Sequence, residues 1–75
     1  MNYKSAVREF ERSHRNLYFD RVDYWTAQYA WSIFTDDLCK AGVITQKQYD
    51  TWLAPFPQGK RLKPKAYMMK GVIYV

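Results

Sequence analysis

Apolar residues recur at helical spacing in three stretches of the chain. In the first stretch they fall, with charged residues between them, at Tyr3, Val7, Phe10, Leu17 and Tyr18. Intervals of three, four and seven residues place such side chains on one face of a helix, so residues 3–18 predict a first helix. A break is expected over residues 16–21. Two further helices are predicted, one from Asp20 or Asp23 to about Ala41 and one from Gln46 to about Leu53.

The connection between the second and third predicted helices carries the clearest local signals. Gly42 has no Cβ and therefore tolerates the left-handed conformation that follows many helix ends. Thr45 is placed to cap the next helix, and Gln48 is placed to reach back to the Thr45 amide. Ile44 and Tyr49 have the spacing of a hydrophobic staple. Together these signals predict an αα-hairpin.

The second predicted helix is apolar over more than half of its circumference. One stripe comprises Ala27, Ala30, Trp31, Phe34, Leu38 and Ala41, and a second line comprises Trp25, Tyr29 and Ile33. Such a helix is usually central and contacted from two sides. We expect a core around Trp31, Phe34, Leu38, Tyr49 and Trp52, and Leu53 is expected to face inward beside Tyr49 and Trp52. The second line is expected to be covered by the C-terminal Val72, Ile73 and Tyr74; otherwise it is left as a surface patch for a partner.

Two polar features of the first predicted helix complete its description. Either Asn2 or Ser5 is placed to cap its start. Glu11 and Arg15 are four residues apart, which is the spacing of a weak ion pair on a helix surface.

The 75 residues form one domain with three parts. Residues 1–57 are the expected helical core, which ends where Pro55 and Pro57 stop the third helix. Residues 58–65 are a basic, turn-rich connector, and residues 66–75 are an extended C-terminal segment. Its last four residues have strand chemistry, and they form a small hairpin about Lys70-Gly71, lie across the helices, or pair with another chain.

Charge is distributed unevenly along the chain, whose net charge is +5. Basic and acidic groups balance over residues 1–57. The last 18 residues hold no acid and five basic residues, which are Lys60, Arg61, Lys63, Lys65 and Lys70. The positive field is therefore assigned to the C-terminal part.

The sequence offers little to catalysis or metal binding. His14 lies on the apolar side of the first helix and Cys39 has no base beside it, so both are interpreted as structural. Asp36 and Asp37 are neighbours, which point to different faces of a helix. There is no phosphate-binding glycine loop and no pair of Cys or His at ligand spacing. We expect no enzyme activity, no cofactor and no metal.

The predicted hairpin does not match a DNA-reading helix-turn-helix. Gln48 and Thr51 occupy the positions, six and nine residues after Gly42, that should be apolar to fix a recognition helix on its partner. We therefore interpret this part of the chain as a plain αα-hairpin.

The expected location follows from three observations. A single cysteine excludes a disulfide within the chain, and no run of 18 apolar residues is present. The charged amphipathic N-terminus differs from a secretory signal. The expected location is the cytoplasm.

Partner binding is the leading functional expectation. The residues assigned to it are Lys60, Arg61, Lys63 and Lys65, with Tyr67, Tyr24 and Trp25 as aromatic anchors. The expected partner is a protein with an acidic or nucleic-acid-binding surface. The alternative is a nucleic-acid-binding accessory protein that uses the basic segment 60–70. A third interpretation is a homo-oligomer paired through residues 72–75.

One longer pattern carries a resemblance to a known group of proteins. It reads Ala30-Trp31-Ser32-x-Phe34-x-Asp36-x-Leu38-Cys39-x-x-Gly42-x-Ile44-Thr45-x-x-Gln48-Tyr49-x-x-Trp52-x-x-Pro55. Over about residues 24–57 the chain resembles small accessory proteins of tailed bacteriophages. The resemblance implies a phage or prophage protein that acts in the bacterial cytoplasm by binding and inhibiting a host or defence-system protein. It implies no catalytic residue.

Overall fold

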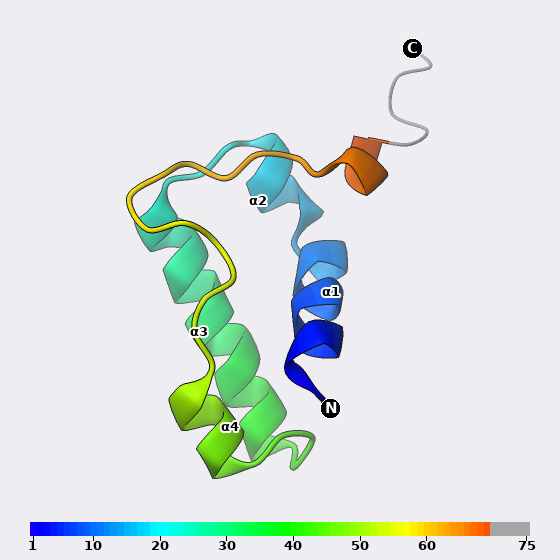
Figure 1. Cartoon of the computed structure of the whole chain (residues 1–75), viewed down its shortest axis with the longest axis vertical. Coiled ribbons are helices and arrows are strands. Elements are labelled where there is room, and N and C mark those ends of the chain that lie inside the picture. Colours follow the sequence, from blue (N-terminus) through cyan, green and yellow to red (C-terminus); the bar gives the residue numbers. More distant parts are fainter. Residues whose placement is uncertain (70–75) are drawn as a thin grey trace.

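The structure is a computed structural model that describes residues 1–69 as four helices and a C-terminal strap (Figure 1). The helices are α1 (Tyr3–Ser13), α2 (Arg15–Phe19), α3 (Tyr24–Lys40) and α4 (Gln46–Thr51). The strap, residues 52–69, is extended and ends in the 3₁₀ turn η1 (Ala66–Met69). The mainly helical class is confirmed, with four helices in place of the predicted three. The predicted strand and oligomer contact at residues 72–75 lie outside the described residues.

The αα-hairpin formed by α3 and α4 is confirmed, together with its turn glycine and its capping box. Gly42 adopts φ +76°, the left-handed conformation that its lack of a Cβ permits. The hydroxyl of Thr45 accepts a hydrogen bond from the Gln48 amide at 3.1 Å, and the Gln48 side chain accepts one from the Thr45 amide at 2.7 Å. This capping box satisfies two amides that an uncapped helix start would leave without partners.

The first predicted helix is interrupted at His14, where φ is −122° and ψ is 35°. Beside the interruption, the Ser13 hydroxyl donates to the Glu9 carbonyl at 2.8 Å, and Nδ1 of His14 lies 3.2 Å from the Phe10 carbonyl oxygen. Side chains that engage nearby carbonyls compete with helical hydrogen bonding and favour helix ends. The prediction of one continuous helix through Tyr18 is therefore wrong. The predicted break over residues 16–21 is also wrong in part, because α2 includes residues 16–19.

The structure shows which of the candidate residues caps α1 and which caps α3. Asn2 caps α1, because its Oδ1 accepts a hydrogen bond from the Ser5 amide at 2.8 Å. Asp23 caps α3, because its Oδ1 accepts one from the Thr26 amide at 3.1 Å. Hydrogen bonding from Thr26 stabilises the ionised carboxylate and holds the pKa of Asp23 below its ordinary value.

The core lies where α1, α2, α3 and the strap meet. Its buried side chains are Ala6, Phe10, Tyr18, Ala27, Trp31, Leu62 and Met68. The Phe10 and Trp31 rings meet edge to face, with centroids 5.3 Å apart, a geometry that aromatic pairs prefer.

The predicted core is correct in part. Trp31 is buried as expected, and Phe34, Leu38 and Trp52 pack around the cluster. Tyr49 is half-buried and belongs to neither group. Leu53 is 80% exposed, which contradicts its predicted inward position. The reason is that α4 ends at Thr51 and Trp52 is extended, so Leu53 leaves the helical register.

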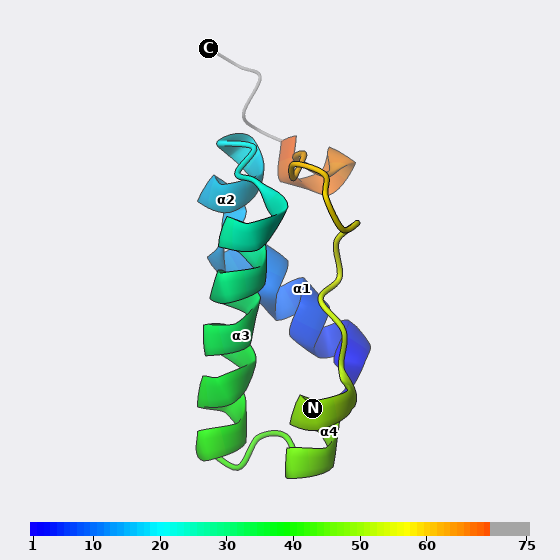
Figure 2. The same ribbon diagram turned by 90° about the vertical axis from the view of Figure 1, so that its left-hand side faces the viewer.

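The strap replaces the predicted connector and runs along the helices on the side where α4 lies (Figure 2). Two of its side chains, Leu62 and Met68, enter the core. The Leu62 amide donates to the Val22 carbonyl at 3.0 Å, and Arg15 donates to the Met68 carbonyl at 2.6 Å. The expectation of a wholly extended segment from residue 66 is wrong for Ala66–Met69, which form η1.

Candidate functional site

One face of α3 carries an apolar row that the described residues do not cover. This α3 outer row comprises Trp25, Tyr29 and Ile33, whose side chains are 67%, 70% and 46% exposed. Spacing of four residues places the three on one side of the helix, opposite the buried Ala27 and Trp31. Within residues 1–69 both α1 and α4 contact α3, but neither covers this row, so the predicted cover of the second apolar line is not found there. The proposed cover, Val72 to Tyr74, lies outside the described residues.

Tyr24 and Trp25 are both predicted aromatic anchors, but their surroundings differ. Tyr24 is half-buried, with its ring centroid 6.1 Å from that of Phe56 in the strap. Trp25 points to the surface, and its ring meets the edge of Tyr24 at a centroid distance of 5.0 Å. Tyr24 thus supports the position of Trp25 and offers less surface of its own.

The predicted basic residues of the strap divide into two kinds. Lys60 and Lys63 are exposed. Arg61 donates to the Arg21 carbonyl at 3.0 Å and so fastens the strap to the turn before α3. Lys65 forms an ion pair with the carboxylate of Glu11. These last two side chains therefore have structural partners as well as positive charge.

Glu11 is the buried acidic group on which the end of the strap is fastened. Its side chain is 5% exposed, and it receives Lys65 and a 3.0 Å hydrogen bond from the Tyr67 hydroxyl. Burial, together with the bond to Glu11, raises the pKa of Tyr67. The predicted Glu11–Arg15 pair is wrong, because Arg15 turns to the Met68 carbonyl instead. Both replacement partners of Glu11 lie more than 50 residues away in sequence.

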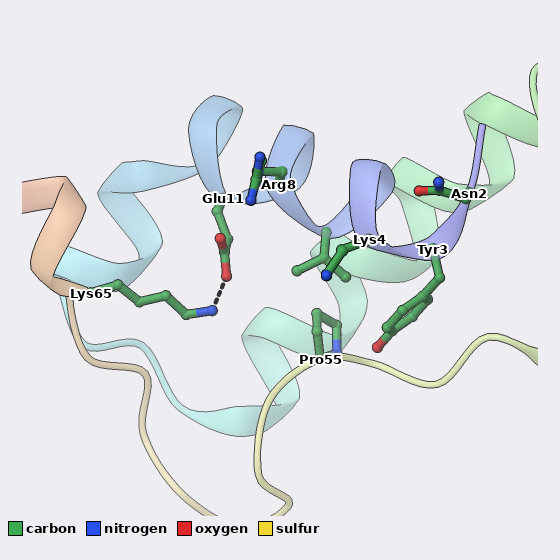
Figure 3. A pocket seen from close by; sticks show the side chains of 8 residues that line it. Asn2, Tyr3, Lys4, Arg8, Glu11, Pro55 and Lys65 are labelled. Carbon is green, nitrogen blue, oxygen red and sulfur yellow. Dashed lines mark hydrogen bonds and ion pairs between the residues drawn. The ribbon is translucent and has the colours of Figure 1, made fainter.

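Three adjoining pockets lie along the strap, two of them between the strap and α1, and we call the three together the basic groove. The first, about 590 Å³ in volume, lies between α1 and Pro55. Figure 3 shows Lys4, Arg8 and Glu11 reaching it from α1, and Lys65 reaching it from the strap. Arg8 and Lys65 also line the second pocket, of about 510 Å³, which adds Arg12 and Tyr67.

The third pocket of the basic groove lies under the strap and measures about 650 Å³. Its apolar part comes from Phe56, Leu62 and Tyr18, and its charged part comes from Lys60, Arg61, Lys63 and Lys65. Among the described residues the buried Tyr18 hydroxyl has no hydrogen-bond partner. Burial first, and then the nearby Glu11 and Tyr67, raise the pKa of Tyr18 well above its ordinary value.

The structure therefore adds three site residues that the sequence analysis missed. Lys4, Arg8 and Arg12, here called the α1 row, border the same groove as the basic residues of the strap. Their spacing of four residues was a visible signal that they share one helix face. This signal was missed because the basic and acidic residues of 1–57 sum to zero charge. A sum over the sequence does not show that the fold places basic residues on one side.

The residues interpreted as structural have ordinary surroundings. The His14 ring stacks on Phe10 with centroids 4.3 Å apart, and the Cys39 thiol lies 3.7 Å from the Gln46 side-chain oxygen. Asp36 forms an ion pair with Lys40 at 2.8 Å, which raises the pKa of Lys40. Within residues 1–69, no three His, Cys, Asp or Glu side chains gather as a metal site would require.

Comparisons with protein-family models, curated proteins and solved structures give no match for this chain. The resemblance to tailed-phage accessory proteins thus stays a prediction. In the part of the chain that the structure describes, no helix has the length and apolar character needed to cross a membrane.

Proposed function

We propose that this chain is a non-enzymatic module that binds and inhibits a bacterial host or defence-system protein through the α3 outer row. The supporting observation is the exposure of Trp25, Tyr29 and Ile33 side by side on one helix. Contiguous apolar surface of this kind is costly to leave in water and is typical of protein-binding sites.

The composition of the row favours a protein partner. Trp and Tyr are enriched among the residues that dominate binding energy, because they bury a large area while few rotatable bonds become fixed. Trp25 is further held by its edge contact with Tyr24. A helix that presents anchors at i, i+4 and i+8 fits a hydrophobic groove on a partner.

The assignment of anchors differs from the one predicted from sequence. Trp25 keeps its role, and Tyr29 and Ile33 join it. Tyr67 and Lys65 contact Glu11, so their first role is to hold the strap. Inhibition is the part of the proposal that follows from the resemblance to phage proteins, whose targets are host or defence proteins.

Affinity capture from a bacterial lysate, with and without nuclease, tests this proposal. The bait is the whole chain, and the test variant is Tyr29→Asp, which places a charge at the centre of the row. Leu53→Asp is the matched control, because Leu53 is at least as exposed as Tyr29 but lies outside the row. We expect one stoichiometric protein that survives nuclease, is retained by Leu53→Asp and is lost by Tyr29→Asp.

The captured protein then gives a direct test of inhibition. Its own activity should fall when the purified chain is added at equal concentration, and Tyr29→Asp should restore it. Capture that vanishes with nuclease, or that Tyr29→Asp leaves unchanged, would contradict the proposal.

A further inference from the structure

The fold brings two sets of positive charges to one groove. The α1 row contributes Lys4, Arg8 and Arg12, and the strap contributes Lys60, Arg61, Lys63 and Lys65. Because Lys65 lines all three pockets, the groove is continuous from the start of α1 to the underside of the strap. Residues far apart in sequence thus form one charged surface.

The charge of this groove favours a polyanion as its ligand. Seven of the chain's 12 basic residues line it, against one acidic residue. That acidic residue, Glu11, is buried and already bonded to Lys65 and Tyr67. Successive members of the α1 row are about 6 Å apart along the helix axis. Charges spread in this way suit a ligand with regularly repeated negative groups better than a single small anion.

Aromatic rings at the same surface narrow the choice of polyanion. Tyr3 lines the first pocket and Tyr67 the second, and their side chains are 38% and 46% exposed. Alternation of cations that follow a backbone with rings that stack on bases is the arrangement of single-strand binding surfaces. An acidic peptide would use the cations but has no need of the rings.

We propose that the basic groove binds single-stranded nucleic acid, with phosphates along the α1 row and bases against Tyr3 and Tyr67. The Lys65–Glu11 pair bridges the strap and α1, so at that point the two walls of the groove lie within the combined reach of one lysine and one glutamate side chain. A strand with unpaired, splayed bases fits such a groove, whereas a duplex does not enter it. The α3 outer row lines none of the three pockets, so this activity is separate from protein binding.

Fluorescence anisotropy with a labelled oligothymidine of about 12 nucleotides tests the proposal. The test variant carries Lys4→Ala, Arg8→Ala and Arg12→Ala. The control variant carries Arg21→Asn, Lys40→Ala and Lys47→Ala, which removes the same charge from exposed residues outside the groove. Asparagine is used at position 21 because it tolerates the positive φ of 51° there. We expect the test variant to bind at least tenfold more weakly and its salt slope to fall by roughly 2. The control variant should bind within about threefold of the unmodified chain.

Further measurements distinguish a specific binding site from general electrostatic attraction. Equal losses in both variants would overturn the proposal, because net charge alone would explain the binding. Equally tight binding of a duplex, or equally strong competition by polyglutamate, would overturn the single-strand assignment.

Variants at Tyr67 test whether bases stack on its ring. Circular dichroism checks that each variant keeps its helical content. Tyr67→Phe keeps the ring and should bind oligothymidine within about twofold of the unmodified chain, whereas Tyr67→Leu should lose several-fold. Both variants remove the hydroxyl bond to Glu11, and only Tyr67→Leu also removes the aromatic ring. A loss of binding seen only in Tyr67→Leu is therefore caused by the loss of the ring. Equal binding by both variants would contradict the stacking role.

Discussion

The two sides of α3 are both apolar, yet only one of them is covered in the described structure. The inner side places Ala27 and Trp31 against α1 and the strap, where both are nearly inaccessible. The outer side presents Trp25 and Tyr29 to solvent. The same helix thus carries one tryptophan in the core and one on the surface, six residues apart.

This contrast teaches that apolar composition alone does not identify core residues. Burial of a tryptophan stabilises the fold, whereas exposure of a tryptophan leaves binding energy available for a partner. The two sides are therefore expected to respond differently to the same substitution, which the following variants measure.

The largest effect is expected from Trp31→Ala. Truncation of a buried tryptophan typically costs about 3–5 kcal/mol of unfolding free energy. A single core in a chain of this length rarely supplies more than about 3–5 kcal/mol in total. We expect the variant to be largely unfolded at 25 °C, as measured by circular dichroism and urea titration. A cooperative transition close to that of the unmodified chain would show that the inner side is not the core.

The next largest effect is expected from Met68→Ala, which tests what covers the inner side. Met68 is fully buried, and its truncation should cost about 2 kcal/mol or more. Because Met68 belongs to the strap, the helices should persist while the strap becomes sensitive to proteolysis between residues 57 and 65. Unchanged proteolysis of the strap would contradict its role as cover. Ala66→Gly is a control at an exposed strap residue.

A smaller effect, limited to alkaline solution, is expected from Tyr18→Phe. Burial raises the pKa of Tyr18 above its ordinary value of 10.0, so above pH 10 the unfolded chain loses a proton that the folded chain keeps. Stability therefore falls as pH rises, by at most about 1.4 kcal/mol per pH unit from this group. Tyr18→Phe should reduce that fall and, because the hydroxyl has no partner among residues 1–69, should cost little at pH 7. Urea titrations at pH 7 and pH 11 measure both effects.

The smallest effect on stability is expected from Trp25→Ala. Surface substitutions away from special features usually change the unfolding free energy by no more than about 0.5 kcal/mol. The urea midpoint should hardly move, while capture of the partner protein should be lost. A destabilisation as large as that of Trp31→Ala would instead mean that the outer side is covered.

Local sequence signals predicted much of the helical part of this fold. Gly42, Thr45 and Gln48 lie within seven residues, and the two hydrogen bonds of the capping box join residues only three positions apart. The cap of α3 at Asp23 was likewise one of two neighbouring candidates. Such features are predictable because the residues that form them cannot move far apart.

The strap and the basic groove escaped prediction because they depend on distant pairs. Nothing near Glu11 in sequence indicates that Lys65 and Tyr67 are its partners, so the local Arg15 was chosen wrongly. Likewise, the burial of Leu62 follows from its position against Val22 and the helices, which its charged neighbours in sequence conceal. Residue spacing gives the face of a helix but not what packs on it.

The long sequence separation of the strap contacts also has a kinetic consequence. The α3–α4 hairpin closes over a few residues, whereas the Lys65–Glu11 contact closes a loop of more than 50 residues. Closing a long loop costs more conformational entropy, and contacts between distant residues slow folding. We expect the hairpin to form early and the strap to dock last. The groove between α1 and the strap would then be the last surface to be assembled as the chain folds.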